Sequence, residues 1–198
     1  LELRTAISQS LAGRTAILHL LPLTIAELAS VQIQFDQFEQ YLFHGFMPRI
    51  YDQAQRPGTA YANYYQTYVE RDVRQLIQLK DVTLFEKFMK LMAGRVGQII
   101  NYQSLAGDIG VSAKTVKDWL SILEASFVVF KLPPYFDNFG KRVIKSPKYY
   151  FTDVGLLAYL LDIEKPEQIT RDPLVGNMFE NLVILELLKA RYNRGRGA

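Results

Sequence analysis

The hydrophobic and polar positions between Tyr102 and Leu123 repeat with the period of two helices joined by a short turn. The apolar positions that would form the inner faces are Leu105, Ala106 and Ile109 in the first helix and Val116, Trp119, Leu120 and Leu123 in the second. Between them, Gly110 can turn the chain, Val111 can fill the corner and Ser112 can cap the second helix through its hydroxyl. This segment therefore predicts a helix-turn-helix.

The outward positions of the second helix are polar. They are Ser112, Lys114, Thr115, Lys117, Asp118 and Ser121. If this helix enters a major groove, its hydroxyls and lysines would reach base edges and phosphates. Helix pairs of this kind also serve as packing units or docking surfaces, and this face carries neither arginine nor asparagine. A DNA-contacting helix and a protein-docking helix both stay open as interpretations.

The same reading predicts further helices and a few strands. The predicted helices run from Thr24 to Leu42, Tyr61 to Leu79, Thr83 to Gly94 and Leu174 to Tyr192, and the predicted strands from Thr15 to Leu21, Phe127 to Leu132 and Tyr149 to Thr152. Gly45 to Pro57 contains two prolines and predicts a connection. We expect a mainly α-helical chain with a small β-ribbon, ending in an amphipathic helix.

Helices followed by a two-stranded ribbon predict a winged helix over residues 61–155. The one local basic block lies in or beside the predicted wing and consists of Lys131, Lys141, Arg142, Lys145 and Lys148. Lys141, Arg142, Lys145 and Lys148 complete the DNA-contact set predicted with Ser112, Lys114, Thr115, Lys117 and Ser121. A solvated hairpin would use lysines equally well, so this pattern does not separate the two interpretations.

Composition and net charge exclude several kinds of site and of protein. The chain has 198 residues, 49% of them hydrophobic, and a net charge of +3, which suffices for a sizeable core but is only mildly basic. It contains no cysteine and two histidines, so disulfides and thiolate metal sites are excluded and no metal site is predicted. The sequence has no long apolar run and no leader pattern, so we expect a soluble cytoplasmic protein that does not span a membrane.

Eight segments together resemble a known family. They are Gln9 to Arg14, Leu21 to Leu28, His44 to Arg49, Tyr68 to Arg74, Asn138 to Arg142, Lys145 to Lys148, Tyr150 to Leu156 and Gly176 to Leu182. In this order they resemble the bacterial and archaeal AAA-superfamily ATPases whose C-terminal half is a domain of unknown function. The resemblance covers essentially the whole chain, which begins with Leu1 rather than methionine. It implies a piece cut at both ends.

The resemblance also implies a domain division. Residues 1–23 would end an ATPase core, 24–60 would form its lid, 61–155 the winged helix, and 156–198 the truncated start of a restriction-nuclease-like domain. Related lids bring a Gly-x-Pro motif to adenine, which makes Gly45, Pro48 and Arg49 weak nucleotide-contact candidates. Phe46 stands where family members commonly have a second glycine.

The sequence lacks the motifs of ATP hydrolysis and of nuclease cleavage, the activities that the resemblance implies for the flanking domains. It has no Gly-x-x-x-x-Gly-Lys-Ser/Thr motif and no Glu-x-Lys triplet, so we assign no catalytic residue. ATP and magnesium are implied only for the full-length parent. We therefore expect a non-catalytic portion of an AAA-type protein that binds duplex DNA, with the missing ATPase core as its other partner. A docking module that regulates the ATPase is the alternative, and homo-oligomer formation stays open.

Overall fold

A computed structural model describes residues 18–68, 82–135, 137 and 146–196. The helices of its first half are α2 (Ile25–Ser30), α3 (Phe38–His44), α4 (Pro48–Asp52), α5 (Pro57–Tyr64) and α7 (Val82–Ala93). The second half holds α8 (Tyr102–Ile109), α9 (Ala113–Ala125), β1 (Val129–Leu132), β2 (Lys148–Phe151), α11 (Val154–Leu160), α12 (Pro166–Ile169) and α13 (Val175–Tyr192). The described part is mainly helical with one two-stranded antiparallel hairpin, which confirms the predicted class.

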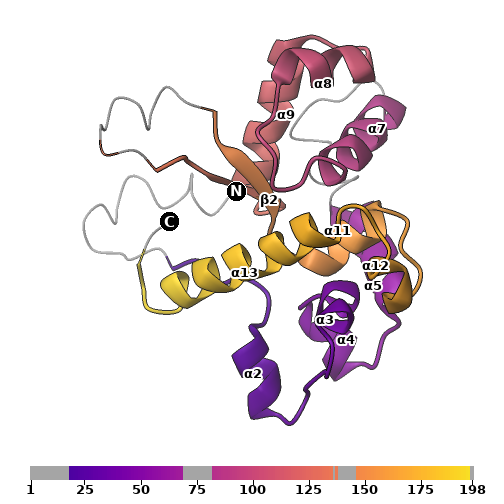
Figure 1. Ribbon diagram of the computed structural model, residues 1–198, viewed down its shortest axis with the longest axis vertical. Helices are drawn as coiled ribbons and strands as arrows, with labels where there is room; N and C mark the ends of the chain where they lie inside the picture. The colour runs from indigo at the N-terminus through magenta and orange to yellow at the C-terminus, as the bar shows by residue number, and fades with distance from the viewer. Residues whose placement is uncertain (1–17, 69–81, 136, 138–145, 197–198) are drawn as a thin grey trace.

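Figure 1 shows two groups of helices with the hairpin, α11 and α13 between them. Helices α7, α8 and α9 gather at the top of the view, whereas α2, α3 and α4 lie at the bottom. One continuous hydrophobic core joins the groups, because buried residues of both belong to the same cluster. No helix in the described ranges is long and apolar enough to cross a membrane.

The helix pair lies where the pattern predicted it. Asn101 caps α8 by accepting hydrogen bonds from the backbone N–H groups of Gln103 and Ser104 at 3.0 and 3.1 Å. Gly110 ends α8 with φ +95°, a conformation that glycine adopts easily. Trp119 of α9 packs against two phenylalanine rings of α7, so the three helices share one core.

The hairpin follows α9 directly. Its register pairs Val129 with Phe151 and Leu132 with Lys148, and Ile99 adds an isolated bridge to Lys148. Both predicted strands are confirmed, although β1 begins two residues later than expected because Phe127, with φ +55°, turns the chain between α9 and β1. The wing tip that the sequence predicted lies outside the described residues over positions 138–145.

The single helix predicted from Thr24 to Leu42 is wrong. Thr24 and Glu27 form a capping box at the start of α2, but α2 ends at Ser30 and α3 begins at Phe38. Gln32 has φ +63°, outside the right-handed helical region, so the helix cannot continue through it. Both helices place apolar residues at helical spacing, so the period alone could not reveal the break.

Other boundaries also differ from the sequence predictions. Residues 18–21 form no strand, and the rest of the strand predicted from Thr15 to Leu21 lies outside the described part, as does the end of the helix predicted from Tyr61 to Leu79. Helix α5 begins earlier, at Pro57, and a π-helical turn follows it over residues 65–68. The predicted connection contains α4, which starts at Pro48. Helices α11 and α12 were not predicted. Because α11 is buried on nearly all sides, its sequence lacks the polar positions that alternate with apolar ones in a surface helix.

Helix α13 is confirmed, and its inner face covers the hairpin. Met178, Leu182 and Leu185 are buried and pack on the core. The amide of Asn181 accepts a hydrogen bond from the Phe151 N–H at 2.8 Å and donates one to the Phe151 carbonyl at 2.9 Å. Asn181 therefore pairs the outer edge of β2 as a third strand would.

Candidate nucleic-acid interface

The outer face of α9 is the surface on which the sequence predicted DNA contact. Lys114, Lys117, Asp118 and Ser121 are exposed, whereas Val116 and Leu123 on the opposite side are completely buried. Burial of the apolar face fixes the rotation of the helix, so the polar face points to solvent. The structure brings four of the predicted contact residues, Ser112, Lys114, Lys117 and Ser121, to one exposed face, with the half-buried Thr115 beside them.

The hydroxyl groups of this face already serve the helix. Ser112 Oγ accepts a hydrogen bond from the Thr115 N–H at 3.0 Å, which confirms it as the N-cap, and the Ser112 and Thr115 hydroxyls lie 2.8 Å apart. Ser121 Oγ donates to the Lys117 carbonyl at 2.9 Å. Among the predicted contact residues on α9, Lys114 and Lys117 therefore supply the exposed positive charges.

Lys117 is positioned by an aromatic ring. Its ammonium nitrogen lies 5.3 Å from the centre of the Tyr102 ring at the start of α8. The Tyr102 hydroxyl lies 3.3 Å from the Tyr149 hydroxyl of β2, so this contact chain links α8, α9 and the hairpin. A depression of about 340 Å³ beside it is lined in part by Asn101, Gln103 and Lys117. A phosphate oxygen lying there would meet a cation and hydrogen-bond donors.

The lysines of the hairpin are engaged within the protein. Lys148 Nζ lies 2.8 Å from Glu180 Oε1, and the Tyr150 hydroxyl donates to the same oxygen at 2.5 Å. These two hydrogen bonds hold the pKa of Glu180 below its usual value. Lys131 forms an ion pair with Glu124 at 3.1 Å. The other predicted wing contacts, Lys141, Arg142 and Lys145, lie outside the described residues.

The residues predicted to contact a nucleotide fall into two environments. Gly45 has φ +62°, and a Cβ there would collide with the Tyr61 hydroxyl and the Asp153 carboxylate. Gly45 is thus enclosed by protein groups, whereas Pro48 and Arg49 are exposed on α4. Contact with a nucleotide stays a prediction for these residues.

Asp153 lies beside Gly45 and was not predicted as a site residue. It is 2% exposed and accepts hydrogen bonds from the Tyr61 hydroxyl at 2.6 Å, the Phe46 N–H at 3.0 Å and the Gly155 N–H at 2.8 Å. Burial raises its pKa despite these donors. An aspartate directly before an apolar run was the available signal, because this is an N-cap position.

Lys189 is a second buried charge that the sequence did not mark. It is 1% exposed, and its Nζ donates to the Leu23 carbonyl at 2.6 Å and to Glu186 at 2.9 Å. Glu186 in turn accepts from the Ile25 N–H at 3.0 Å. Burial lowers the pKa of Lys189. These bonds fasten the start of α2 to α13 over a sequence separation of more than 160 residues.

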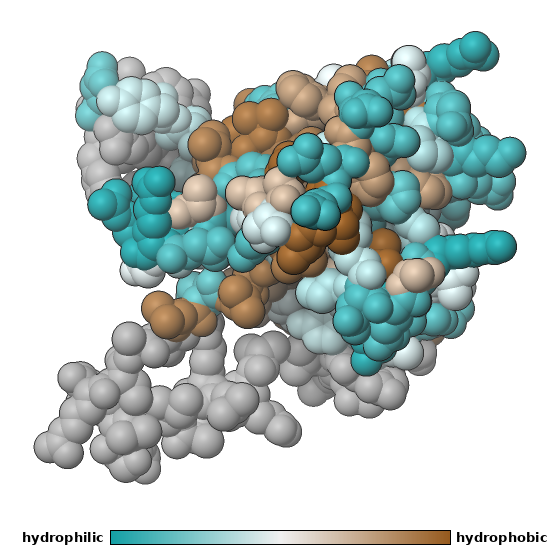
Figure 2. Space-filling view, turned by 90° about the horizontal axis from the view of Figure 1, so that it is seen from below, coloured by the Kyte–Doolittle hydropathy of each residue, from teal (hydrophilic) through white to brown (hydrophobic). Residues whose placement is uncertain are grey.

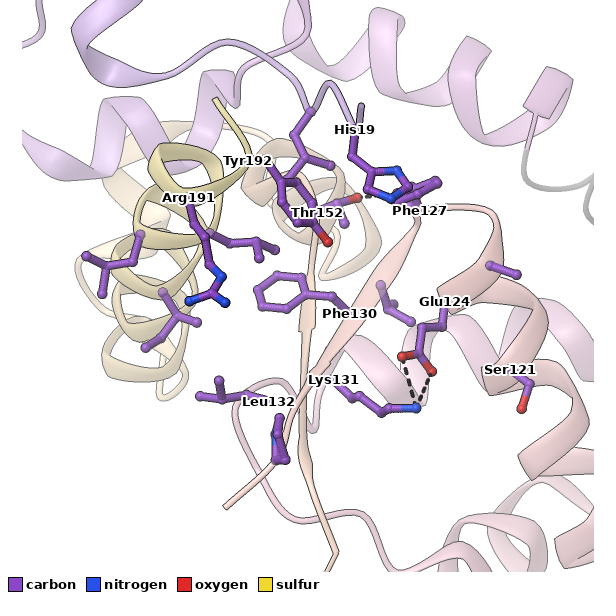
Figure 3. Close-up of a pocket in the computed structure, with 17 residues that line it drawn as sticks. His19, Ser121, Glu124, Phe127, Phe130, Lys131, Leu132, Thr152, Arg191 and Tyr192 are labelled. Atoms are coloured by element: carbon purple, nitrogen blue, oxygen red, sulfur yellow. Dashed lines mark hydrogen bonds and ion pairs between the residues drawn. The ribbon is translucent and has the colours of Figure 1, made fainter. Parts of the chain in front are cut away.

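A cavity of about 900 Å³ lies behind the hairpin, between β1, the end of α9 and α13 (Figure 3). Phe127, Phe130, Leu132 and further aliphatic side chains form most of its wall. Figure 3 shows Lys131 and Glu124 joined to each other at its rim. No cluster of three metal-ligating residues occurs in the described ranges. This wall suits apolar contacts better than the charged backbone of a nucleic acid.

Comparison with known proteins places the chain in a family. The family model described as "Domain of unknown function (DUF8612)" matches residues 35–167. The chain belongs to this family. DUF8612 here includes α3 to α11, and therefore the helix pair, the hairpin and Asp153.

Two curated relatives of this DUF8612 chain carry the description "uncharacterized protein". Rv2008c of Mycobacterium tuberculosis is 31% identical over 181 residues, which cover 91% of this chain and 40% of that protein. An uncharacterized protein of Haemophilus influenzae is 24% identical over 198 residues, covering 92% and 47% of the two chains. The chain thus spans less than half the length of these relatives. No solved structure matches it significantly.

Proposed function

We propose that this chain is a non-catalytic portion of a larger AAA-type ATP-binding protein, and that α7, α8, α9 and the hairpin form a winged helix that binds duplex DNA. The observation that carries the proposal is the two-faced character of α9, with Val116 and Leu123 buried and Lys114 and Lys117 exposed. The order of three helices followed directly by a hairpin supports it.

The chemistry of the exposed face points to contact with the DNA backbone more than to base reading. Lys114 and Lys117 would neutralise phosphates, and the hydroxyls of Ser112, Thr115 and Ser121 already make intrahelical hydrogen bonds. Since sequence is read mainly by side chains that pair with base edges, we expect strong salt dependence and weak sequence selectivity.

The ATPase part of the proposal rests on the sequence resemblance. ATP and magnesium would be bound by a P-loop core elsewhere in the full-length protein, and residues 24–60 would act as its lid. The chain spans about 40% of the first relatives, which leaves room for such a core in proteins of that length. Hydrogen bonds from the Ile25 N–H to Glu186 and from the Phe46 N–H to Asp153 would then join this lid to α13 and to the start of α11.

Fluorescence anisotropy with a mixed-sequence duplex tests the DNA-binding part. The affinity should fall as salt rises, and Lys114→Glu with Lys117→Glu should weaken binding. The slope of log affinity against log salt should decrease in magnitude by about 0.9 for each phosphate that the variant no longer neutralises. Circular dichroism should show unchanged folding, because both lysines are exposed.

A matched control changes the same number of charges on another surface. Lys165 and Arg171 are exposed near α12, so Lys165→Glu with Arg171→Glu alters the net charge equally without touching α9. Equal weakening by both double variants would show that only net charge matters. An absence of binding even at low salt would retire the DNA proposal and favour a docking role for α9.

A further inference from the structure

The outer face of α13 is apolar, although it faces solvent in the described part of the chain. Between Val175 and Ala190, the exposed positions of this helix are Gly176, Phe179, Val183, Leu187 and Ala190. Phe179, Val183 and Leu187 expose 44%, 43% and 65% of their surface. A surface helix normally carries charged residues on this side, so a continuous apolar stripe marks an interaction surface.

The stripe has a symmetry that indicates what covers it. Its spacing along the helix is three, four, four and three residues, centred on Val183. In an antiparallel pair of α13 helices related by a twofold axis at Val183, Phe179 would face Leu187 of the other copy. Gly176 would face Ala190, so a small residue would lie at each end and allow close approach.

The flanking charges permit this pairing. Glu180 and Glu186 lie beside the stripe and would approach each other across the axis. Glu180, however, is neutralised by Lys148 at 2.8 Å, and Glu186 by Lys189 at 2.9 Å. Each glutamate is therefore paired with a lysine of its own copy, which reduces the repulsion between the two copies.

Hollows on both sides of the stripe would receive the side chains of a facing helix. One, of about 530 Å³, lies between α13 and the α2–α3 region and includes Phe38, whose ring contacts the Phe179 ring edge-on at 5.1 Å. The other is the cavity behind the hairpin, and Leu187 lines both. Figure 2 shows hydrophobic surface in the middle of the face seen from below. A ridge between two grooves is the surface form that helix pairs use.

We propose that two copies of this chain associate through α13, antiparallel and about a twofold axis at Val183. Sedimentation velocity and light scattering across a wide range of concentrations should reveal a species of twice the 22.8 kDa of one chain. Val183→Glu, which places two carboxylates at the axis, should weaken the dimer at least about tenfold. Val31→Glu is the matched control, because Val31 is 63% exposed and lies outside the stripe.

Cysteine cross-linking gives a test with little disturbance of folding, because the chain has no cysteine of its own. Under mild oxidation, Val183→Cys should form a covalent dimer and Val31→Cys should not. Phe179→Cys alone should stay uncrosslinked, because the equivalent residues would be separated by about 12 Å along the axis. Mixed Phe179→Cys and Leu187→Cys chains should cross-link.

A charge-reversal pair separates this dimer from other associations. Phe179→Lys alone should disrupt the dimer, and Phe179→Lys with Leu187→Glu in one chain should restore it, because each lysine would face a glutamate of the other copy. A monomer at all concentrations, or a dimer that survives Val183→Glu and does not cross-link through Val183→Cys, would overturn the proposal. Neither outcome depends on DNA binding.

Discussion

The ammonium group of Lys189 lies 3.8 Å from the centre of the Phe46 ring, and both side chains are fully buried. Lys189 belongs to α13, near one end of the chain, and Phe46 to the turn between α3 and α4. A desolvated cation over a ring is stabilised by the ring quadrupole and here also by a carboxylate and a carbonyl. This contact holds the turn between α3 and α4 against α13.

Replacing Lys189 should therefore loosen the packing of α2, α3 and α4 on α13. Lys189→Met fills a similar volume but removes the ammonium donor from the Leu23 carbonyl and from Glu186, which then keeps only its hydrogen bond from the Ile25 N–H. We expect a loss of about 2 kcal/mol in the free energy of unfolding, measured by urea denaturation. Lys165→Met, at an exposed position, should change it by less than about 0.5 kcal/mol. If Lys189→Met leaves the free energy of unfolding unchanged, the attraction between Lys189 and Glu186 does no more than offset the cost of removing Lys189 from water.

Gly45→Ala should be among the most destabilising small substitutions. The new methyl group would overlap the Tyr61 hydroxyl and the Asp153 carboxylate, and alanine disfavours φ +62°. We expect a loss of at least about 3 kcal/mol, seen as a lower urea midpoint or as failure to fold. Gly107→Ala, in open space on α8, should instead stabilise the protein by about 0.5 kcal/mol. A tolerated Gly45→Ala would mean that this turn can rearrange.

Stability should fall at alkaline pH because of buried tyrosines. Burial raises the pKa of Tyr61, Tyr64 and Tyr149. These tyrosines have a higher pKa in the folded state than in the unfolded state. Their contribution to the free energy of unfolding is therefore fully present below pH about 10, and it is lost as the pH rises through the folded-state pKa. Lys189, whose pKa is lowered, acts in the opposite direction over the range just below its unfolded pKa.

Urea titrations at increasing alkaline pH measure this effect. The urea midpoint should decrease above pH about 10, and the tyrosinate absorbance of the buried tyrosines should appear only together with unfolding. Tyr61→Phe should lessen the dependence on pH, because it removes one of the shifted groups, although Asp153 then keeps only its backbone donors. Tyrosinate absorbance that develops fully before unfolding would contradict the burial of these hydroxyls.

Val116→Asp should unfold the helix pair. Val116 is completely buried on the inner face of α9, and an unpaired carboxylate there would be strongly unfavourable. We expect a loss of more than about 3 kcal/mol, measured by thermal and urea unfolding. Ser121→Asp, on the exposed face of the same helix, is the control and should leave folding intact. Similar effects of both would mean that α9 tolerates no added charge on either side.

Several elements could be predicted because their signals lie within a few residues of one another. The caps at Ser112 and Thr24 each act on an N–H three residues away, and the apolar period of α9 directly selects its buried face. The hairpin strands and α13 were predicted for the same reason. The candidate contacts on α9 depend on this local order, so their exposure could be foreseen.

The remaining features depended on residues that are distant in sequence. Only the folded chain brings Lys148 to Glu180, which turns a predicted phosphate contact into part of an internal ion pair. Only the fold encloses Gly45 and removes water from Asp153 and Lys189. The break at Gln32 also escaped prediction, because the helices on both sides continue the same apolar period. The sequence by itself determined the local helices, the hairpin and the faces of α9, because hydrogen bonds and side-chain period act over short distances. The tertiary structure decided which charges are buried, paired or exposed, because electrostatic and packing energies depend on the neighbours that folding supplies.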